Sequence, residues 1–180
     1  EIAKRKDDVQ KLERLIADLI RSEMEKSDVV KGDNKVPDID LTNITSSFEK
    51  NKSLLPWPVS SGFVSERFGS HPHPIYKRIK VPNDGISIQT KQDEKVKAVF
   101  NGMVKKVAVV PGMKYVVIVQ HGNYYTVYAR LKDVFVHMGQ NIKINDILGA
   151  VNTDVNGVSE LQFQVWKNTT KLDPELWLAK

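Results

Sequence analysis

The chain has 180 residues, of which 41% are hydrophobic and 27% are charged, a composition that supports both a buried core and a solvated surface. It has no cysteine, which excludes disulfides and thiolate metal sites, and no run of 18 apolar residues, which argues against a membrane span. The net charge of +5 comes from residues 54–180, but the lysines there are scattered along predicted strands, so we expect no nucleic-acid partner.

Residues 1–27 are expected to form one helix, because they contain neither glycine nor proline. Apolar residues recur at intervals of seven in two series, Ile2, Val9, Ile16 and Leu12, Leu19. This spacing is the heptad seam of a coiled coil, so we interpret the segment as the C-terminal end of a longer coil, with a coiled-coil partner or self-association. The alternative is an amphipathic helix that packs on its own domain. Because the chain begins within this pattern, we expect the sequence to be an internal fragment.

Residues 28–53 are polar and are expected to form a linker or regulatory arm. A glycine and a proline break the preceding helix. Leu41, Ile44 and Phe48 are three and four residues apart, which permits a short second helix. An arm of this kind can fold back on the domain that follows it.

From Leu54 onward the hydrophobic pattern has a period of two, which is typical of strands. Two such runs, 95–100 and 103–110, flank Asn101-Gly102, a strong short signal for a β-hairpin. Further strands are expected at 114–120 and 124–131, which form a second pair around His121-Gly122-Asn123, and at 147–151 and 159–166. Short strands at this spacing predict a mainly β, antiparallel domain over residues 54–180.

A series of short segments in this region resembles, in order, the zinc peptidase domains of the lysostaphin/LytM type. These segments are 55–59, 67–69, 73–74, 83–87, 96–102, 128–131, 138–140, 161–165 and 172–178. The resemblance covers residues 54–178. It implies an antiparallel, lysostaphin-like β domain, preceded by the N-terminal coiled-coil helix and the helical arm.

In active members of this family, one aspartate and two histidines hold zinc, and two more histidines serve catalysis. By this resemblance, the ligand positions are Asn83, Ser87 and Gln162, and the two catalytic histidines are replaced by Arg130 and Glu160. Neutral oxygen donors are poor zinc ligands, and Arg130 puts a fixed positive charge where a dication would sit. We therefore expect no metal, no cofactor and no catalytic residue, and we expect Glu160 to pair with Arg130.

The resemblance implies that the former active site is a partner-binding groove, with Asn83, Ser87, Arg130, Glu160 and Gln162 as its floor. A coiled coil, an arm and a degenerate LytM-type domain in this order resemble the EnvC-type murein hydrolase activators. Those proteins bind an N-acetylmuramoyl-L-alanine amidase during cell division and relieve its autoinhibition. The similarity implies an amidase partner, contact with peptidoglycan, and a periplasmic or cell-envelope location in a bacterium, with residues 28–53 as a gate over the groove.

Two alternatives stay open. The first is a passive scaffold that binds peptidoglycan or a protein partner. The second is a zinc metallopeptidase of the lysostaphin family with residual activity and other ligands. His71 and His73 form a His-x-His pair that could bind metal, but they fall in a predicted surface loop, so we expect them to be structural.

Overall fold

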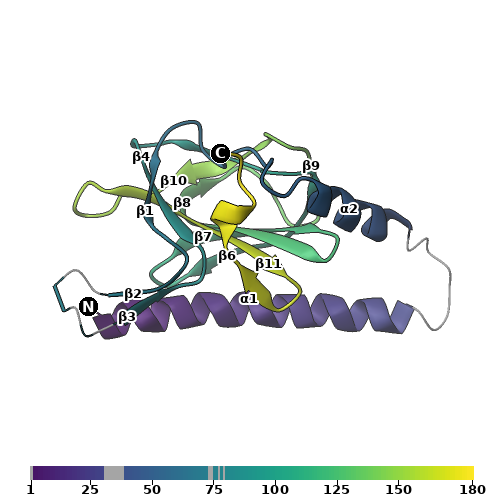
Figure 1. Ribbon diagram of the computed structural model, residues 1–180, viewed down its shortest axis with the longest axis horizontal. Helices are drawn as coiled ribbons and strands as arrows, with labels where there is room; N and C mark the ends of the chain where they lie inside the picture. Colours follow the sequence, from purple (N-terminus) through teal and green to yellow (C-terminus); the bar gives the residue numbers. More distant parts are fainter. Residues whose placement is uncertain (1, 31–38, 73–74, 77, 79) are drawn as a thin grey trace.

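The computed structural model describes residues 2–30, 39–72, 75–76, 78 and 80–180 (Figure 1). Two helices, α1 (Ile2–Val30) and α2 (Ile39–Lys50), precede the strands, and a 3-10 helix (Pro174–Leu176) follows them. The strands are β1 (Phe63–Glu66), β2 (Gly69–Pro72), β3 (Lys80–Asn83), β4 (Ile86–Thr90), β5 (Lys95–Lys97), β6 (Gly102–Val110), β7 (Lys114–His121), β8 (Tyr124–Val134), β9 (Asn141–Ile142), β10 (Ile147–Val151), β11 (Ser159–Lys167) and β12 (Thr170–Leu172). Neither helix has an apolar stretch that could cross a bilayer within these described residues.

One large antiparallel sheet dominates the molecule, with the strand order β1-β4-β11-β8-β7-β6-β9. Strand β10 joins it through β8 and also pairs with β5, while β12 pairs with β11. Strands β2 and β3 form a separate two-stranded sheet near the start of α1 (Figure 1). This architecture confirms the predicted fold class, a mainly β, antiparallel domain preceded by helical segments.

One of the two predicted hairpins is present and the other is not. Strands β7 and β8 are joined by Gly122-Asn123, as predicted. The hairpin predicted at Asn101-Gly102 is wrong, because β5 pairs with β10 and not with β6. A two-residue hairpin turn of the Asn-Gly kind needs a positive φ at both residues, and neither Asn101 nor Gly102 has one.

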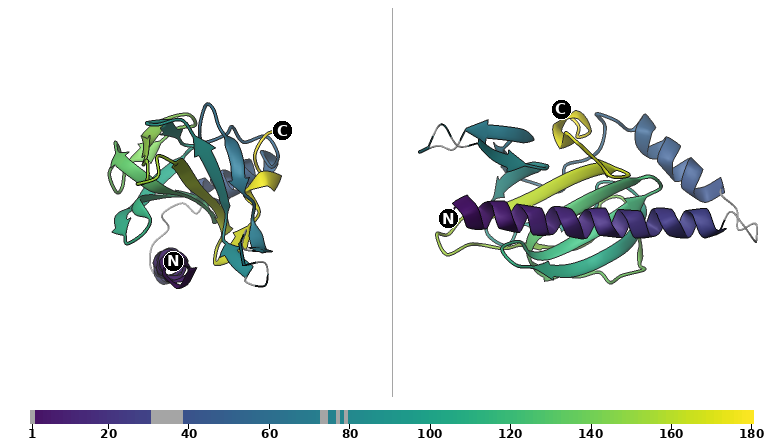
Figure 2. Two further views of the ribbon diagram at one scale, coloured as in Figure 1. Left: turned by 90° about the vertical axis from the view of Figure 1, so that its left-hand side faces the viewer. Right: turned by 90° about the horizontal axis from the view of Figure 1, so that it is seen from below.

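Helix α1 lies lengthwise across one face of the large sheet (Figure 2). Its side chains Leu12, Ile16 and Ile20 are fully buried in a cluster with residues of β6, β7, β8 and β11. Burial of each such side chain stabilises the fold by roughly 1.5–3 kcal/mol. The coiled-coil interpretation of residues 1–27 is therefore corrected in favour of the alternative: the apolar seam faces the chain's own sheet.

Strand β7 is buried on both of its faces. Val116 and Ile118 belong to the cluster under α1, whereas Val117 and Val119 belong to the main core on the opposite side. Since alternate side chains of a strand point to opposite faces, this division follows directly from the strand geometry. The sheet is thus a middle layer between α1 and the main core.

Helix α2 confirms the short helix predicted within residues 28–53, of which 31–38 lie outside the described residues. Its Phe48 is fully buried in the main core and stacks on Tyr124 and His121, with ring centroids 4.7 and 5.0 Å apart. Glu49 of the same helix accepts a hydrogen bond from the Tyr124 hydroxyl at 2.8 Å and pairs with Lys167 at 3.2 Å. Helix α2 is thus fixed at the end of β11 where Lys167 lies.

Candidate functional site

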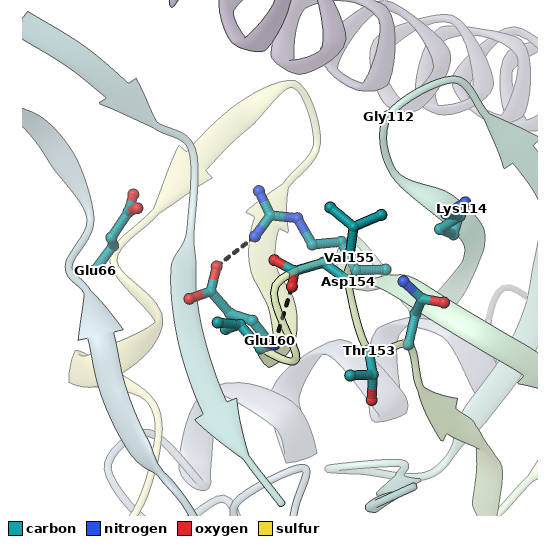
Figure 3. Close-up of a pocket in the computed structure, with 10 residues that line it drawn as sticks. Glu66, Gly112, Lys114, Thr153, Asp154, Val155 and Glu160 are labelled. Atoms are coloured by element: carbon teal, nitrogen blue, oxygen red, sulfur yellow. Dashed lines mark hydrogen bonds and ion pairs between the residues drawn. The ribbon is translucent and has the colours of Figure 1, made fainter. Parts of the chain in front are cut away.

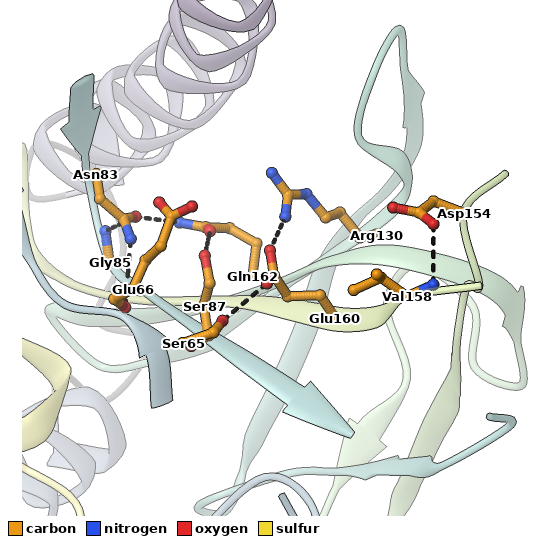
Figure 4. Close-up of polar contacts among 10 residues, drawn as sticks. All are labelled: Ser65, Glu66, Asn83, Gly85, Ser87, Arg130, Asp154, Val158, Glu160 and Gln162. Atoms are coloured by element: carbon orange, nitrogen blue, oxygen red, sulfur yellow. Dashed lines mark hydrogen bonds and ion pairs between the residues drawn. The ribbon is translucent and has the colours of Figure 1, made fainter. Parts of the chain in front are cut away.

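The three positions that correspond to the family's zinc ligands come together in space. Asn83 ends β3, Ser87 lies on β4, and Gln162 lies on β11 directly opposite Ser87. The Ser87 hydroxyl donates a hydrogen bond to Gln162 Oε1 at 3.0 Å, and Gln162 Nε2 donates one to Asn83 Oδ1 at 2.8 Å (Figure 4). We call these three hydrogen-bonded side chains the polar triad.

The polar triad is buried and its polar atoms are used within the chain. Only 1% of Ser87, 5% of Gln162 and 7% of Asn83 is exposed. Asn83 Oδ1 accepts a second hydrogen bond, from the Gly85 N–H at 3.2 Å. These neutral amide and hydroxyl groups bind zinc far less well than imidazole or carboxylate, so the donor set does not fit zinc. Across the part of the chain that the structure describes, no cluster of three or more histidine, aspartate or glutamate side chains could hold a metal.

The two positions that correspond to the catalytic histidines form an ion pair, as predicted. Arg130 on β8 donates to Glu160 Oε1, and the Ser65 hydroxyl of β1 donates to Glu160 Oε2 at 2.7 Å. Glu160 and Gln162 are two residues apart on β11 and therefore share a face of the sheet. The ion pair lies beside the polar triad (Figure 4), and both oxygens of Glu160 are occupied.

Asp84 follows Asn83 in the sequence but does not join the polar triad. Lys171 Nζ lies 3.1 Å from Asp84 Oδ1 and 3.1 Å from Glu13 Oε1 of α1. Burial raises the pKa of the Asp84 carboxyl above its ordinary value, and the hydrogen bond from Lys171 opposes this shift. The carboxylate next to Asn83 in the chain is therefore linked to α1 and not to the groove.

The histidine pair considered as a metal site is described only in part. His73 lies outside the described residues. His71 is on β2, and its Nε2 lies 2.9 Å from the carbonyl oxygen of Arg67 and 3.1 Å from that of Phe68. A ring nitrogen in this position donates to backbone carbonyls, which is a structural role.

A cavity of about 550 Å³ opens beside the ion pair (Figure 3). It is lined by Glu66, Gly112, Lys114, Arg130, Asn152, Thr153, Asp154, Val155, Val158 and Glu160. Of the predicted groove floor, Arg130 and Glu160 line this cavity, while the polar triad is buried and does not. The accessible part of the site is therefore displaced from the polar triad toward the turn between β6 and β7 and the loop between β10 and β11.

Two cationic residues at this cavity have an uncommon backbone conformation. Lys114 has a φ of 55° and Arg130 a φ of 64°, in the left-handed region that long side chains rarely adopt. The residues lie on neighbouring strands, and the Arg130 N–H donates to the carbonyl of Met113, the residue before Lys114, at 2.7 Å. The pairing of β7 with β8 is irregular here, so both residues sit where the ladder is interrupted.

The loop between β10 and β11, residues 152–158, forms another wall of the cavity. Asp154 organises it, because its Oδ1 accepts hydrogen bonds from the N–H groups of Asn156 and Val158, each at 2.9 Å. The Asn152 N–H donates to the Arg130 carbonyl at 2.9 Å and ties the loop to β8. Within this hydrogen-bonded loop, Val155 is fully exposed.

Sequence reasoning missed Lys114 and Val155 as members of the site. Asn156-Gly157 is a turn signal from which a loop could have been predicted. The sequence pattern does not say which strand such a loop lies against, so its place beside Arg130 comes from the structure alone.

Comparison with known proteins places this geometry among peptidases and their relatives. The sequence model of peptidase family M23 matches residues 81–174, which is more than half of the chain. An uncharacterized metalloprotease of Buchnera aphidicola subsp. Baizongia pistaciae is 26% identical over 145 residues. That match covers 79% of this chain and 37% of the relative, so the chain spans little more than a third of that protein's length.

Solved structures show the same fold at low sequence identity. Csd3 from Helicobacter pylori matches with a TM-score of 0.61 and 24% identity, covering 72% of this chain and 38% of that one. A chain of the SpoIIQ–SpoIIIAH pore-forming complex matches with a TM-score of 0.61 and 22% identity, covering 72% of this chain and 93% of that one.

Proposed function

This chain belongs to peptidase family M23, and on that basis we propose that it is a non-catalytic member that binds and activates a cell-wall N-acetylmuramoyl-L-alanine amidase. The observation that carries the proposal is the chemistry of the five former functional positions. Three of them form the polar triad, and the other two form the Arg130–Glu160 ion pair. The hydrogen-bonding groups of these side chains are used by one another, and none of the side chains is a good zinc ligand. This chemistry supports a binding role for the fold and not hydrolysis.

A protein-binding role has support from the comparisons. A chain with the same fold occurs in the SpoIIQ–SpoIIIAH complex, which is an assembly of two proteins. The accessible cavity beside Arg130 offers a place where a segment of a partner can bind. The amidase as partner, the EnvC-like role in cell division or peptidoglycan remodelling, and the bacterial cell envelope as location are part of the proposal.

The test is a dye-release assay with labelled peptidoglycan and a purified amidase from the same organism. The amidase alone is expected to release dye slowly, this chain alone to release none, and the mixture to release dye several times faster. Arg130→Glu is expected to weaken activation, because it removes the cation of the groove and places a second carboxylate beside Glu160. Lys143→Glu, a charge reversal at an exposed residue outside the cavity, is the control.

Three outcomes would contradict the proposal or a part of it. Unchanged activation by a folded Arg130→Glu variant would remove Arg130 from the binding surface; circular dichroism melting checks the fold, and Arg130→Gln serves if the reversal unfolds the chain. Dye release by this chain alone, together with stoichiometric zinc in the protein, would favour the metallopeptidase alternative. Binding to purified cell wall without any effect on the amidase would favour the passive scaffold.

A further inference from the structure

The dipeptide Asn-Gly occurs twice in the sequence, as Asn101-Gly102 and as Asn156-Gly157. Asparagine is a chemically labile residue, because the backbone nitrogen of the next residue can attack its side-chain amide. A following glycine favours this attack, since it has no Cβ to obstruct the approach and its backbone adopts many conformations. By sequence alone the two pairs are equally reactive, so any difference between them comes from the fold.

The first pair is fixed by the sheet. Asn101 Oδ1 accepts a hydrogen bond from the Ile144 N–H at 2.8 Å, and Gly102 begins β6 and pairs with Ile142 of β9. A Cβ at Gly102 would lie 2.4 Å from the Gln120 carbonyl oxygen, so the glycine backbone packs directly against β7. Attack on the Asn101 amide requires these contacts to break.

The second pair lies in the exposed loop between β10 and β11. Asn156 and Gly157 are both exposed, and a Cβ at Gly157 would meet nothing within 4 Å. The side-chain amide of Asn156 forms no hydrogen bond with any residue that the structure describes. The Gly157 N–H donates only to the Asp154 carbonyl, at 3.1 Å, which is a contact within the same short turn.

The two sites therefore differ in the cost of freeing the glycine nitrogen. Exposed loops open locally at little cost in free energy, whereas strands inside a sheet open only together with much of the structure. The turn at Gly157 lies outside the paired residues of β10 and β11. Freeing Gly102, in contrast, opens the end of β6 against both of its neighbours, β7 and β9.

We propose that Asn156 is a site of deamidation and isoaspartate formation in the native protein, and that Asn101 is not. The Gly157 nitrogen loses its proton to solvent and bonds to Asn156 Cγ, the Cγ–Nδ2 bond breaks, and Nδ2 leaves as ammonia. Water then opens the cyclic imide. Breaking the bond from the Gly157 nitrogen to Cγ gives aspartate, and breaking its bond to the backbone carbonyl carbon of Asn156 gives isoaspartate.

This modification changes a wall of the cavity, because Asp154, Val155 and Val158 of the same loop line it. Asp154 Oδ1 accepts hydrogen bonds from the N–H groups of Asn156 and Val158, the second of which is drawn in Figure 4. The isoaspartyl link inserts one backbone carbon between these two N–H groups, and both products add a negative charge to the loop. The inference does not depend on the proposed amidase partner.

The experiment incubates the full chain at mildly alkaline pH and follows each Asn-Gly peptide by digestion and mass spectrometry, with fragmentation that distinguishes isoaspartate from aspartate. In the native protein the Asn156 peptide is expected to deamidate about tenfold faster than the Asn101 peptide, or more. In guanidinium chloride the two rates are expected to agree within about twofold, because the structure that distinguishes the sites is lost.

Variants assign the product. Asn156→Gln is expected to remove most of the isoaspartate of the native protein, measured with an isoaspartate-specific methyltransferase, because attack on the longer side chain forms a larger ring more slowly. Asn101→Gln, the matched change, is expected to leave the signal unchanged. Circular dichroism melting checks both folds, and the two peptides of the parent protein give the same comparison if Asn101→Gln unfolds the chain.

Three results would overturn the inference. They are equal rates at the two sites in the native protein, isoaspartate that persists in Asn156→Gln, and an Asn156 peptide that stays unmodified in the native protein while both sites react in denaturant.

Discussion

At the scale of single residues, the polar triad is held together by the central amide of Gln162. Its Oε1 accepts from Ser87 and its Nε2 donates to Asn83, so one side chain satisfies two buried neighbours. A buried polar group left without a partner costs about 1–3 kcal/mol. The amide therefore has a structural reason to be present at this position.

Replacement of this amide is expected to destabilise the fold. Gln162→Leu removes the partner of both Ser87 and Asn83, and the free energy of unfolding should fall by about 1–3 kcal/mol. Urea denaturation measures the change. Gln92→Leu, at an exposed glutamine, should stay within about 0.5 kcal/mol of the parent protein, and an equal loss in both variants would contradict the argument.

The geometry also predicts that metal binding can be introduced. In Asn83→His, Ser87→Asp, Gln162→His, zinc-binding side chains replace three that already converge within hydrogen-bond distance. Elemental analysis is expected to find about one zinc per chain in the triple variant and no stoichiometric zinc in the parent or in Asn83→His alone. A folded triple variant without zinc would mean that the Arg130 charge or the local backbone prevents coordination.

Part of this site could be predicted from the sequence. The Arg130–Glu160 pair followed from two opposite charges at positions expected to be adjacent, and the structure confirms it. The hydrogen bonds within the polar triad could not be predicted, because a sequence shows which polar groups are present but not which of them bond to one another. Lys114 and Val155 were missed because their place at the site depends on a loop and on an irregular strand pairing.

At the scale of elements, α1 shows how one hydrophobic pattern can fit two structures. Intervals of seven place apolar residues on one helix face, and that face can pack on another helix or on a sheet. The sheet beneath α1 has its own matching face, formed in part by Val116 and Ile118. Strand β7 is apolar on both faces, and a strand of this kind needs a covering element on each side of the sheet.

The contribution of this helix can be measured at its centre. Ile16→Ala is expected to lower the free energy of unfolding by about 2–5 kcal/mol, because the side chain is fully buried between α1 and the sheet. Arg14→Ala, at an exposed position of the same helix, should have an effect of less than about 0.5 kcal/mol. Equal stability of the two variants in denaturant would show that α1 is not docked in solution.

The failed hairpin at Asn101 has a local explanation. The Asn101 carbonyl accepts from His121 at 2.6 Å, and its side-chain Oδ1 accepts from the Ile144 N–H at 2.8 Å. Both groups are thus committed to contacts distant in sequence, which a two-residue pattern cannot reveal. The Gly122-Asn123 turn was predictable because it joins two long neighbouring strands directly.

At the scale of the whole molecule, a buried polar series runs through the main core. His121 Nδ1 lies 2.6 Å from the Asn101 carbonyl, which can only accept, so Nδ1 carries the proton and Nε2 accepts from Thr126 at 2.8 Å. The Thr126 and Tyr128 hydroxyls are 3.1 Å apart, and the Val99 N–H donates to the Tyr128 oxygen. This series requires a neutral imidazole.

The fold is therefore expected to lose stability as the pH falls. Burial lowers the pKa of His121 from 6.5 to about 4, so between these pH values the unfolded chain binds a proton that the native chain does not. The stabilisation is fully present above pH 6.5, and about 3 kcal/mol is lost as the pH falls to about 4. Denaturant titrations at several pH values measure this slope.

His121→Gln provides the comparison for this measurement, because glutamine does not titrate and can still donate to the Asn101 carbonyl. Its unfolding free energy is expected to vary less between pH 7 and pH 4 than that of the parent. The other titrating groups affect both proteins alike. The difference between the two slopes of unfolding free energy against pH therefore gives the contribution of His121. Parallel slopes would show that His121 is not the group responsible.

The burial of Phe48 and of the inner face of α1 bears on how this protein can be prepared. A recombinant fragment that starts at residue 54 would leave the α1 cluster and the aromatic end of the main core open to water. Large apolar surfaces of this kind cause proteins to stick to one another. Such a shortened product should elute from a sizing column as oligomers. Proteins recovered with it in a pull-down would bind the exposed apolar surface and not the cavity lined by Lys114 and Arg130.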